Sequence, residues 1–127
     1  MTTPICHDDH QAIRLVIQDY FEGVSSADRA PLDRAWDAGS GHWKGVVTDP
    51  GRVETVKVEP IADSIRRWAA GTPGTSTGRI VALEVIDGQL AIVKFELQLG
   101  DERFLDVLSL YKVNGTWKLV NKVFVRR

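Results

Sequence analysis

Residues 104–124 read FLDVLSLYKVNGTWKLVNKVF, in which two runs of alternating apolar residues flank Asn114-Gly115. Alternation with a period of two is typical of strands, and an Asn-Gly pair between such runs predicts a tight hairpin. Upstream, Asp87-Gly88 and Gly100-Asp101 separate further runs of the same kind. The chain after Gly78 therefore predicts a four-stranded antiparallel meander.

The chain before Gly78 carries helical signals instead. Ile13, Ile17 and Tyr20 have the spacing of one apolar helical stripe, and Asp8 stands where a helix cap is expected. The expected elements are helices over residues 8–24, 31–37 and 60–70 and short strands over residues 42–47 and 53–58. We therefore predict a single α+β domain over residues 1–127, with three N-terminal helices packed on a curved antiparallel sheet.

The composition excludes several classes of protein and of site. The 127 residues have a net charge of −1, which predicts no nucleic-acid partner, and no apolar run is long enough to predict a membrane span. Cys6 is the one cysteine, so no intrachain disulfide is possible. No spaced set of ligands predicts a metal site, and we expect no cofactor. The N-terminal residues contain no apolar signal core, so we expect a cytoplasmic protein.

The tight turns fix which residues share a face of the sheet. Counting back from Asn114-Gly115 with strict alternation pairs Asp106 with Val123 and places Asn121 on the same face. This face is the more apolar one, so we assign it to the core. Its polar exceptions are Glu84, Asp106 and Asn121.

The opposite face is too apolar to remain in water. By the same counting it carries Leu83, Ile92, Leu105, Val107, Val120 and Phe124, interleaved with Lys94, Glu96, Lys118 and Lys122. A meander normally leaves one face polar, and the three helices are needed on the core face. We therefore predict a homodimer that packs through this outer face.

Three segments together resemble the nuclear transport factor 2-like superfamily. They are IQDYFEGVSSADRAPLDRAW, HWKGV and the run FLDVLSLYKVNGTWKLVNKVF. The superfamily includes ketosteroid isomerases, scytalone dehydratase and polyketide cyclases, and the C-terminal run is most similar to its lumazine-binding family. The resemblance implies a cone-shaped fold, a dimer through the outer sheet face and a ligand of the pterin or lumazine type.

The ketosteroid isomerases provide a match by position. Their tyrosine oxyanion donor on the first helix corresponds to Tyr20, and their protonated aspartate corresponds to Asp106. Their base aspartate falls on Lys44, so the resemblance is broken at the catalytic base.

Asp106 and Asn121 are the most informative candidate residues. A buried carboxylate must find donors or shift its pKa upward, so Asp106 is either a hydrogen-bonding group or acid in a pocket or a structural carboxylate bonded to Tyr20, Trp36 or His42. An amide both donates and accepts, so Asn121 either contacts the same ligand or holds Asp106 in place.

His42 and Lys44 share one face of the first strand, with Trp43 on the other. If their face is turned inward, His42 can exchange protons at neutral pH, and Lys44 can bind an anion or act as a base when desolvated. If it is turned outward, both are solvated and Trp43 belongs to the core. Tyr20 either presents its hydroxyl to the pocket or is a core residue. The residues that either stack on a flat ligand or fill the core are Trp36, Trp68, Phe95 and Trp117.

Two functions remain open from the sequence. The first is a small-molecule binding domain with a mostly apolar pocket, for a heterocyclic or other planar ligand. The alternative is a cofactor-free isomerase, dehydratase or cyclase that uses Asp106, His42 and Tyr20.

Overall fold

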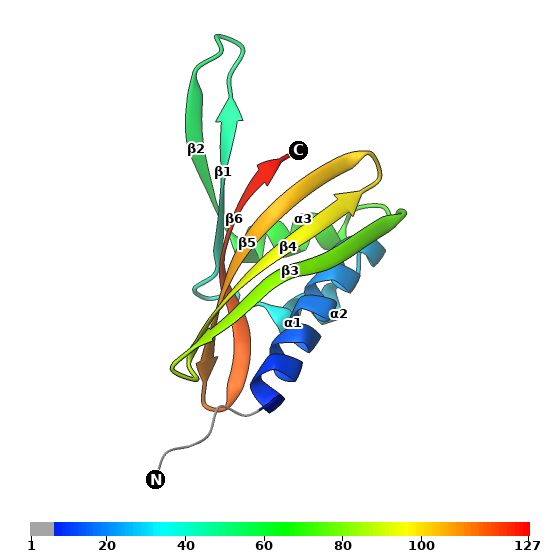
Figure 1. Cartoon of the computed structure of the whole chain (residues 1–127). Coiled ribbons are helices and arrows are strands. Elements are labelled where there is room, and N and C mark those ends of the chain that lie inside the picture. The colour runs from blue at the N-terminus through cyan, green and yellow to red at the C-terminus, as the bar shows by residue number, and fades with distance from the viewer. Residues whose placement is uncertain (1–6) are drawn as a thin grey trace.

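The computed structural model describes residues 7–127. Three helices and six strands form one α+β unit (Figure 1). In chain order they are α1 (His7–Ser26), α2 (Arg29–Ala35), β1 (His42–Thr48), β2 (Glu54–Pro60), α3 (Ile61–Ala69), β3 (Ser76–Ile86), β4 (Leu90–Leu99), β5 (Glu102–Val113) and β6 (Thr116–Arg126). Every predicted helix and strand is present, with bounds that differ by a few residues. None of the helices within residues 7–127 is long and apolar enough to cross a membrane.

The strands form a single mixed sheet in the order β2-β1-β6-β5-β4-β3. The antiparallel meander from β3 to β6 is confirmed. The expectation of a wholly antiparallel sheet is wrong, because β1 runs parallel to β6. The physical reason lies at the end of α2, where Trp36 bridges to Leu119 and the Asp37 amide donates to the Leu119 carbonyl at 2.9 Å. From this contact the chain continues into β1, which runs beside β6 and in the same direction as β6.

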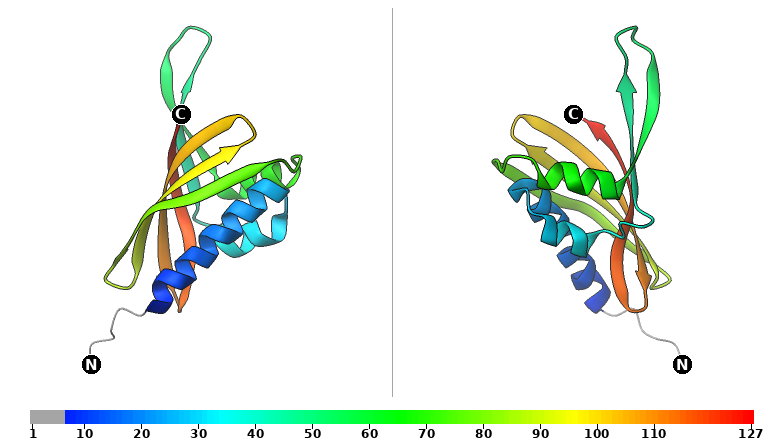
Figure 2. Two further views of the ribbon diagram at one scale, coloured as in Figure 1. Left: turned by 45° about the vertical axis from the view of Figure 1, so that its right-hand side comes forward. Right: turned by 180° about the vertical axis from the view of Figure 1, so that it is seen from behind.

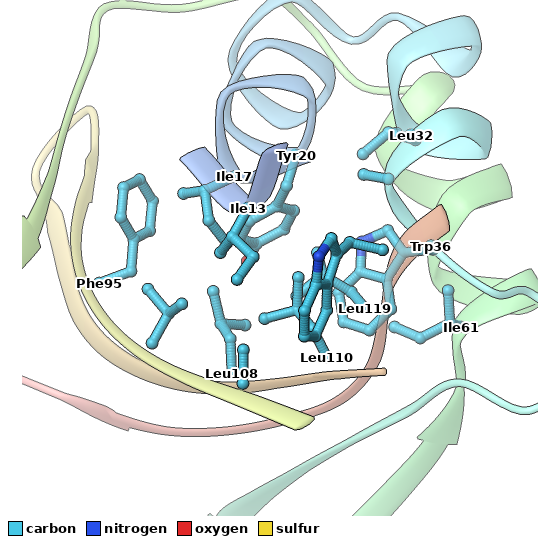
Figure 3. Packing of buried hydrophobic residues seen from close by; sticks show 14 of the residues in the cluster. Ile13, Ile17, Tyr20, Leu32, Trp36, Ile61, Phe95, Leu108, Leu110 and Leu119 are labelled. Atoms are coloured by element: carbon cyan, nitrogen blue, oxygen red, sulfur yellow. The ribbon is translucent and has the colours of Figure 1, made fainter. Parts of the chain in front are cut away.

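All three helices cover one face of the sheet (Figure 2). The apolar stripe of α1 packs against β5, where Leu108 and Leu110 face it (Figure 3). Ile13, Ile17 and Tyr20 are almost completely buried in this contact. Burial of such a face stabilises the fold by roughly 25 cal/mol per Å² of apolar surface.

The predicted register holds at the Gly100-Asp101 and Asn114-Gly115 turns and fails beyond a bulge in β6. Asn114 and Gly115 have φ angles of 51° and 80°, and they join Val113 to Thr116 as a two-residue turn. Val120 is an extra residue, since Leu110 pairs with Leu119 but Ser109 pairs with Asn121. A bulge moves every following side chain to the opposite face.

The bulge corrects five assignments in β6. Asn121, Val123 and Val125 lie on the outer face and not on the core face, and Lys122 and Phe124 point inward and not outward. Asp106 accordingly pairs with Phe124 and not with Val123.

The first hairpin of the meander is also one residue longer than predicted. Residues 87–89 connect Ile86 to Leu90, so Leu83 pairs with Val93 on the core side and Glu84 pairs with Ile92 on the outer side. Both residues were predicted on the opposite face.

The outer face remains strongly apolar after these corrections. Ile92, Leu105 and Val107 stay on it, and Val123 and Val125 replace Leu83 and Phe124. The β1–β2 hairpin extends beyond the rest of the sheet (Figure 1) and continues this face with Val46, Val56 and Val58. Val56 is 65% exposed and Val125 is 57% exposed. Within residues 7–127, no helix packs on this side of the sheet (Figure 2).

Candidate functional site

A chain of three polar side chains crosses the interface between α1 and the sheet. The Tyr20 hydroxyl donates to Oδ2 of Asp106 at 2.9 Å, and Nζ of Lys122 donates to the Tyr20 hydroxyl at 2.9 Å. Asp106 is completely buried and Lys122 is 9% exposed. Two titratable groups of opposite charge are thus joined through one phenol inside an apolar core.

Each member of this chain is placed by a different element. Tyr20 belongs to the buried stripe of α1, and its ring packs edge-on against Trp36 with centroids 5.8 Å apart (Figure 3). Asp106 lies on the core side of β5, between its partners Phe95 on β4 and Phe124 on β6. The bulge at Val120 turns Lys122 of β6 toward them.

Burial dominates the electrostatics of this chain. It raises the pKa of Asp106 above its ordinary value, although the charge of Lys122 and the Tyr20 hydrogen bond oppose that rise. It lowers the pKa of Lys122, although the charge of Asp106 favours the ammonium. Burial and the neighbouring Asp106 raise the pKa of Tyr20, so its phenol stays protonated. Perturbed acids and bases beside a pocket are typical of functional sites.

A pocket of about 720 Å³ opens beside this chain. Tyr20 and Lys122 line it, and Asp106 lies behind them. The ammonium nitrogen of Lys122 lies 5.1 Å from the centroid of Trp68 and 5.0 Å from that of Phe124. The other lining residues are Val24, Trp43, Val46, Val47, Thr48, Lys57, Arg67, Leu97, Leu99, Glu102, Phe104 and Arg126. The pocket is therefore mainly apolar and aromatic, with cations in its wall.

A second polar network holds the pocket wall formed by α3 and β1. The Trp43 indole donates to Oγ of Ser64 at 2.7 Å, and that hydroxyl donates to Oε1 of Glu59 at 2.6 Å. Arg67 pairs with the same carboxylate. Burial works to raise the pKa of Glu59, but the hydrogen bonds from Ser64 and Arg67 and the charges of Arg67 and Lys57 together lower that pKa. The network fixes the Trp43 ring and keeps the Arg67 guanidinium at the pocket.

The structure separates the predicted site residues into two groups. Tyr20 and Asp106 are together, as predicted for the core face. His42, Lys44 and Asn121 lie on the other face, where Nζ of Lys44 donates to Oδ1 of Asn121 at 3.0 Å. Of the two orientations considered for His42 and Lys44, the structure has the outward one, and Trp43 points inward. Asn121 therefore does not share a pocket with Asp106.

The four candidate aromatic residues have different environments. Trp68 lines the pocket, while Phe95 packs on Tyr20 with ring centroids 6.2 Å apart. Trp36 is buried beneath Tyr20 and Trp68. Trp117 lies elsewhere, where its indole donates to Oδ1 of Asp9 at 3.0 Å. Of these four, only Trp68 is a lining residue.

Sequence reasoning missed Lys122 and Arg67. Strict alternation placed Lys122 outward, whereas the adjacent apolar pair Leu119-Val120 interrupts that alternation and is a signal of a bulge. A buried carboxylate at Asp106 also favours a cationic neighbour. Lys122 is the nearest lysine in the predicted strand that pairs with the strand of Asp106. Arg67 gave no comparable signal, because arginines on a short helix are usually solvated. In the described part of the chain, no three metal-ligating side chains gather.

Three comparisons relate this chain to known proteins. A sequence profile of the family described as "Putative lumazine-binding" matches residues 8–125. Among curated proteins, none matches the chain.

Solved structures share the fold. A nuclear transport factor 2-like protein of unknown function from Shewanella baltica is 22% identical, with a TM-score of 0.82 over 100% of this chain and 98% of its own. A second such protein, from Methylobacillus flagellatus, is 24% identical with the same TM-score and coverage. The association domain of C. elegans CaMKII is 18% identical, with a TM-score of 0.67 over 92% of this chain and 95% of its own.

Proposed function

Since this chain belongs to the family described as putative lumazine-binding and has the nuclear transport factor 2-like fold, we propose that it binds a small planar molecule in the pocket beside Lys122. The observation that carries the proposal is the buried Lys122 amino group between the Trp68 and Phe124 rings, at the wall of a mainly apolar pocket. Pockets of this size with a mostly apolar surface are typical of small-molecule sites. In the cone-shaped fold expected of nuclear transport factor 2-like proteins, this pocket corresponds to the open end of the cone.

The side chains favour a flat ligand that carries a carbonyl or anionic group. The Trp68 and Phe124 rings offer faces and edges for stacking, and Nζ of Lys122 offers N–H donors to an oxygen acceptor. Lys57, Arg67, Lys122 and Arg126 line the pocket together with the carboxylate of Glu102, and Glu59 behind the wall pairs with Lys57 and Arg67. A wall with this charge favours an electron-rich heterocycle, and the pteridine-dione lumazine combines a flat ring with carbonyl oxygens.

A titration of the protein with lumazine tests this proposal. We expect wild-type protein to bind lumazine, and Lys122→Met to weaken binding by about tenfold to a hundredfold, since a buried ligand oxygen that loses its donor costs about 1–3 kcal/mol. Isothermal titration calorimetry measures both affinities. Lys118→Met is the matched control, because Lys118 lies on the same strand but reaches the Asp33 carbonyl instead of the pocket. Equal affinities for the Lys122→Met and Lys118→Met proteins would contradict the proposed role of Lys122.

A second candidate function is a cofactor-free enzyme that moves protons within the same pocket. The hydrogen bond from Tyr20 to Asp106 favours it, because it joins the two residues that match the oxyanion-stabilising pair of ketosteroid isomerases. In this alternative, Lys122 supplies the base that the match by position lacks, and His42 has no part since it lies on the outer face.

We also propose that two copies of the chain pack through their outer sheet faces. The apolar residues Ile92, Leu105, Val107, Val123 and Val125 lie together there, and the described helices all lie on the other side. A second copy presents the same patch, as a two-fold dimer requires. The likeness in fold to an association domain supports assembly.

A further inference from the structure

The amine of Lys122 has more hydrogen-bonding capacity than its surroundings use. Its bond to the Tyr20 hydroxyl is the single hydrogen bond that it makes within residues 7–127. Around the rest of the nitrogen lie the Trp68 and Phe124 rings. An ammonium has three N–H donors, so two of them lack a protein acceptor here. A neutral amine at this place costs less, because burial without partners penalises the charged form.

Asp106, at the other end of the hydrogen-bonded series of Lys122, Tyr20 and Asp106, also has too few hydrogen-bond partners. Oδ2 of Asp106 accepts from Tyr20, but Oδ1 is buried and has no hydrogen-bond partner among the described residues. An unpartnered oxygen costs more in a carboxylate than in a neutral carboxylic acid. Burial raises the pKa of Asp106 and lowers that of Lys122, so both ends shift toward their neutral forms.

The Tyr20 hydroxyl can carry hydrogen bonds in either direction. In the ion pair, Lys122 donates to Tyr20 and Tyr20 donates to Asp106. With both ends neutral, the Asp106 carboxyl donates to Tyr20, and Tyr20 donates to Nζ of Lys122 across the same separations of 2.9 Å. Moving one proton from Lys122 to Tyr20 and one from Tyr20 to Asp106 converts one state into the other. The result is a neutral amine at the wall of the pocket.

We propose that Lys122 is a reactive amine, which condenses with the carbonyl group of a planar aldehyde or ketone in the pocket to form an imine. This inference rests on the proposed function, because the carbonyl compound occupies the same pocket. Apolar surroundings that free an amine of its proton are a recognised way to activate lysine as a nucleophile.

The condensation needs no oxidant, reductant or metal. The lone pair of Nζ forms a bond to the carbonyl carbon, and the π electrons of the C=O bond move to oxygen, which takes up a proton as the nitrogen loses one through Tyr20. The carbon–oxygen bond then breaks, and the hydroxyl leaves as water with a second proton from the nitrogen, whose electron pair completes the C=N bond. One amine and one carbonyl give one imine and one water, with Tyr20 and Asp106 as the proton relay.

The charged groups that face Lys122 act in opposing directions. The carboxylates of Asp106 and Glu59 favour the ammonium, whereas the guanidinium of Arg67 and, above all, burial disfavour it. Because their combined effect lowers the pKa of Lys122, it has more free amine at neutral pH than an ordinary exposed lysine.

Reductive trapping tests the inference on the full chain. The protein is incubated at neutral pH with 6-methoxy-2-naphthaldehyde and sodium cyanoborohydride, and labelled lysines are located by peptide mass spectrometry. We expect about tenfold more label on Lys122 than on Lys112, whose side chain is 35% exposed and pairs with Asp9 of α1, away from the pocket and from the outer face. A fall of one unit in a pKa gives about tenfold more free amine. Excess lumazine should protect Lys122 and leave the labelling of Lys112 unchanged. Lys122→Arg should remove the preferred label, whereas the matched change Lys118→Arg should retain it.

The outcomes separate this inference from the proposed function. If wild-type protein binds lumazine but Lys122 is labelled no faster than Lys112, the amine is not reactive and the inference is overturned while the binding function stands. If the protein binds neither lumazine nor the aldehyde in the pocket, the proposed function itself is wrong.

Discussion

A Val107→Glu protein is expected to be monomeric at micromolar concentrations at which the wild type is a dimer. Val107 lies on β5 in the middle of the outer face, between Lys94 on β4 and Val123 on β6. The new carboxylate has Lys94 beside it in the monomer, so the fold should tolerate the change. In the proposed dimer two such carboxylates would lose their water, at a cost of several kcal/mol each that the neighbouring Lys94 offsets only in part. This cost raises the dissociation constant more than about a hundredfold.

Light scattering at several protein concentrations measures this effect. Leu15→Glu is the matched control, because Leu15 is 56% exposed on α1, on the helical side of the molecule. That protein should dimerise like the wild type. A wild type that is monomeric at micromolar concentration, or a Val107→Glu dimer as stable as the parent, would refute the proposed assembly.

Tyr20→Phe should be the most destabilising removal of a single atom from the site. The change keeps the ring, and with it the edge-on contact to Trp36, but removes the hydroxyl that accepts from Lys122 and donates to Asp106. Two buried ionisable groups then lose their partner, and we expect the free energy of unfolding to fall by about 3 kcal/mol. Urea denaturation followed by circular dichroism measures the loss.

Tyr111→Phe is the natural control, since Tyr111 is 46% exposed on the outer face and should change stability by less than about 0.5 kcal/mol. Adding Asp106→Leu and Lys122→Met to Tyr20→Phe should recover much of the loss, because apolar residues often replace buried ionic groups without cost. If Tyr20→Phe and Tyr111→Phe are equally stable, the polar chain does not hold the interface between α1 and the sheet.

Local signals were sufficient to predict the elements and their order. Asn114 and Gly115 adopt the positive φ angles that a two-residue turn requires, and the stripe of α1 is buried as its spacing predicts. The parallel pairing of β1 with β6 was not predictable in this way, because it depends on where the chain leaves α2. Local propensity does not encode such a contact.

The site was predicted only in part for a related reason. Tyr20 lies on α1 and Asp106 lies on β5. The register error beyond Val120 in β6 therefore did not change the face predicted for either residue. Asn121 and Lys122 follow Val120, and one extra residue exchanged their faces. The consequence is chemical as well as geometric: the pocket contains an amine where the alternating pattern predicted an amide.

The crystal structure of the protein grown with lumazine tests the central claim most directly. We predict electron density for lumazine in the pocket, with its ring against Trp68 and Phe124 and a carbonyl oxygen within hydrogen-bond distance of Nζ of Lys122. A pocket that stays empty at saturating lumazine, or lumazine bound instead in the groove beside Thr77 and Arg103, would contradict the claim.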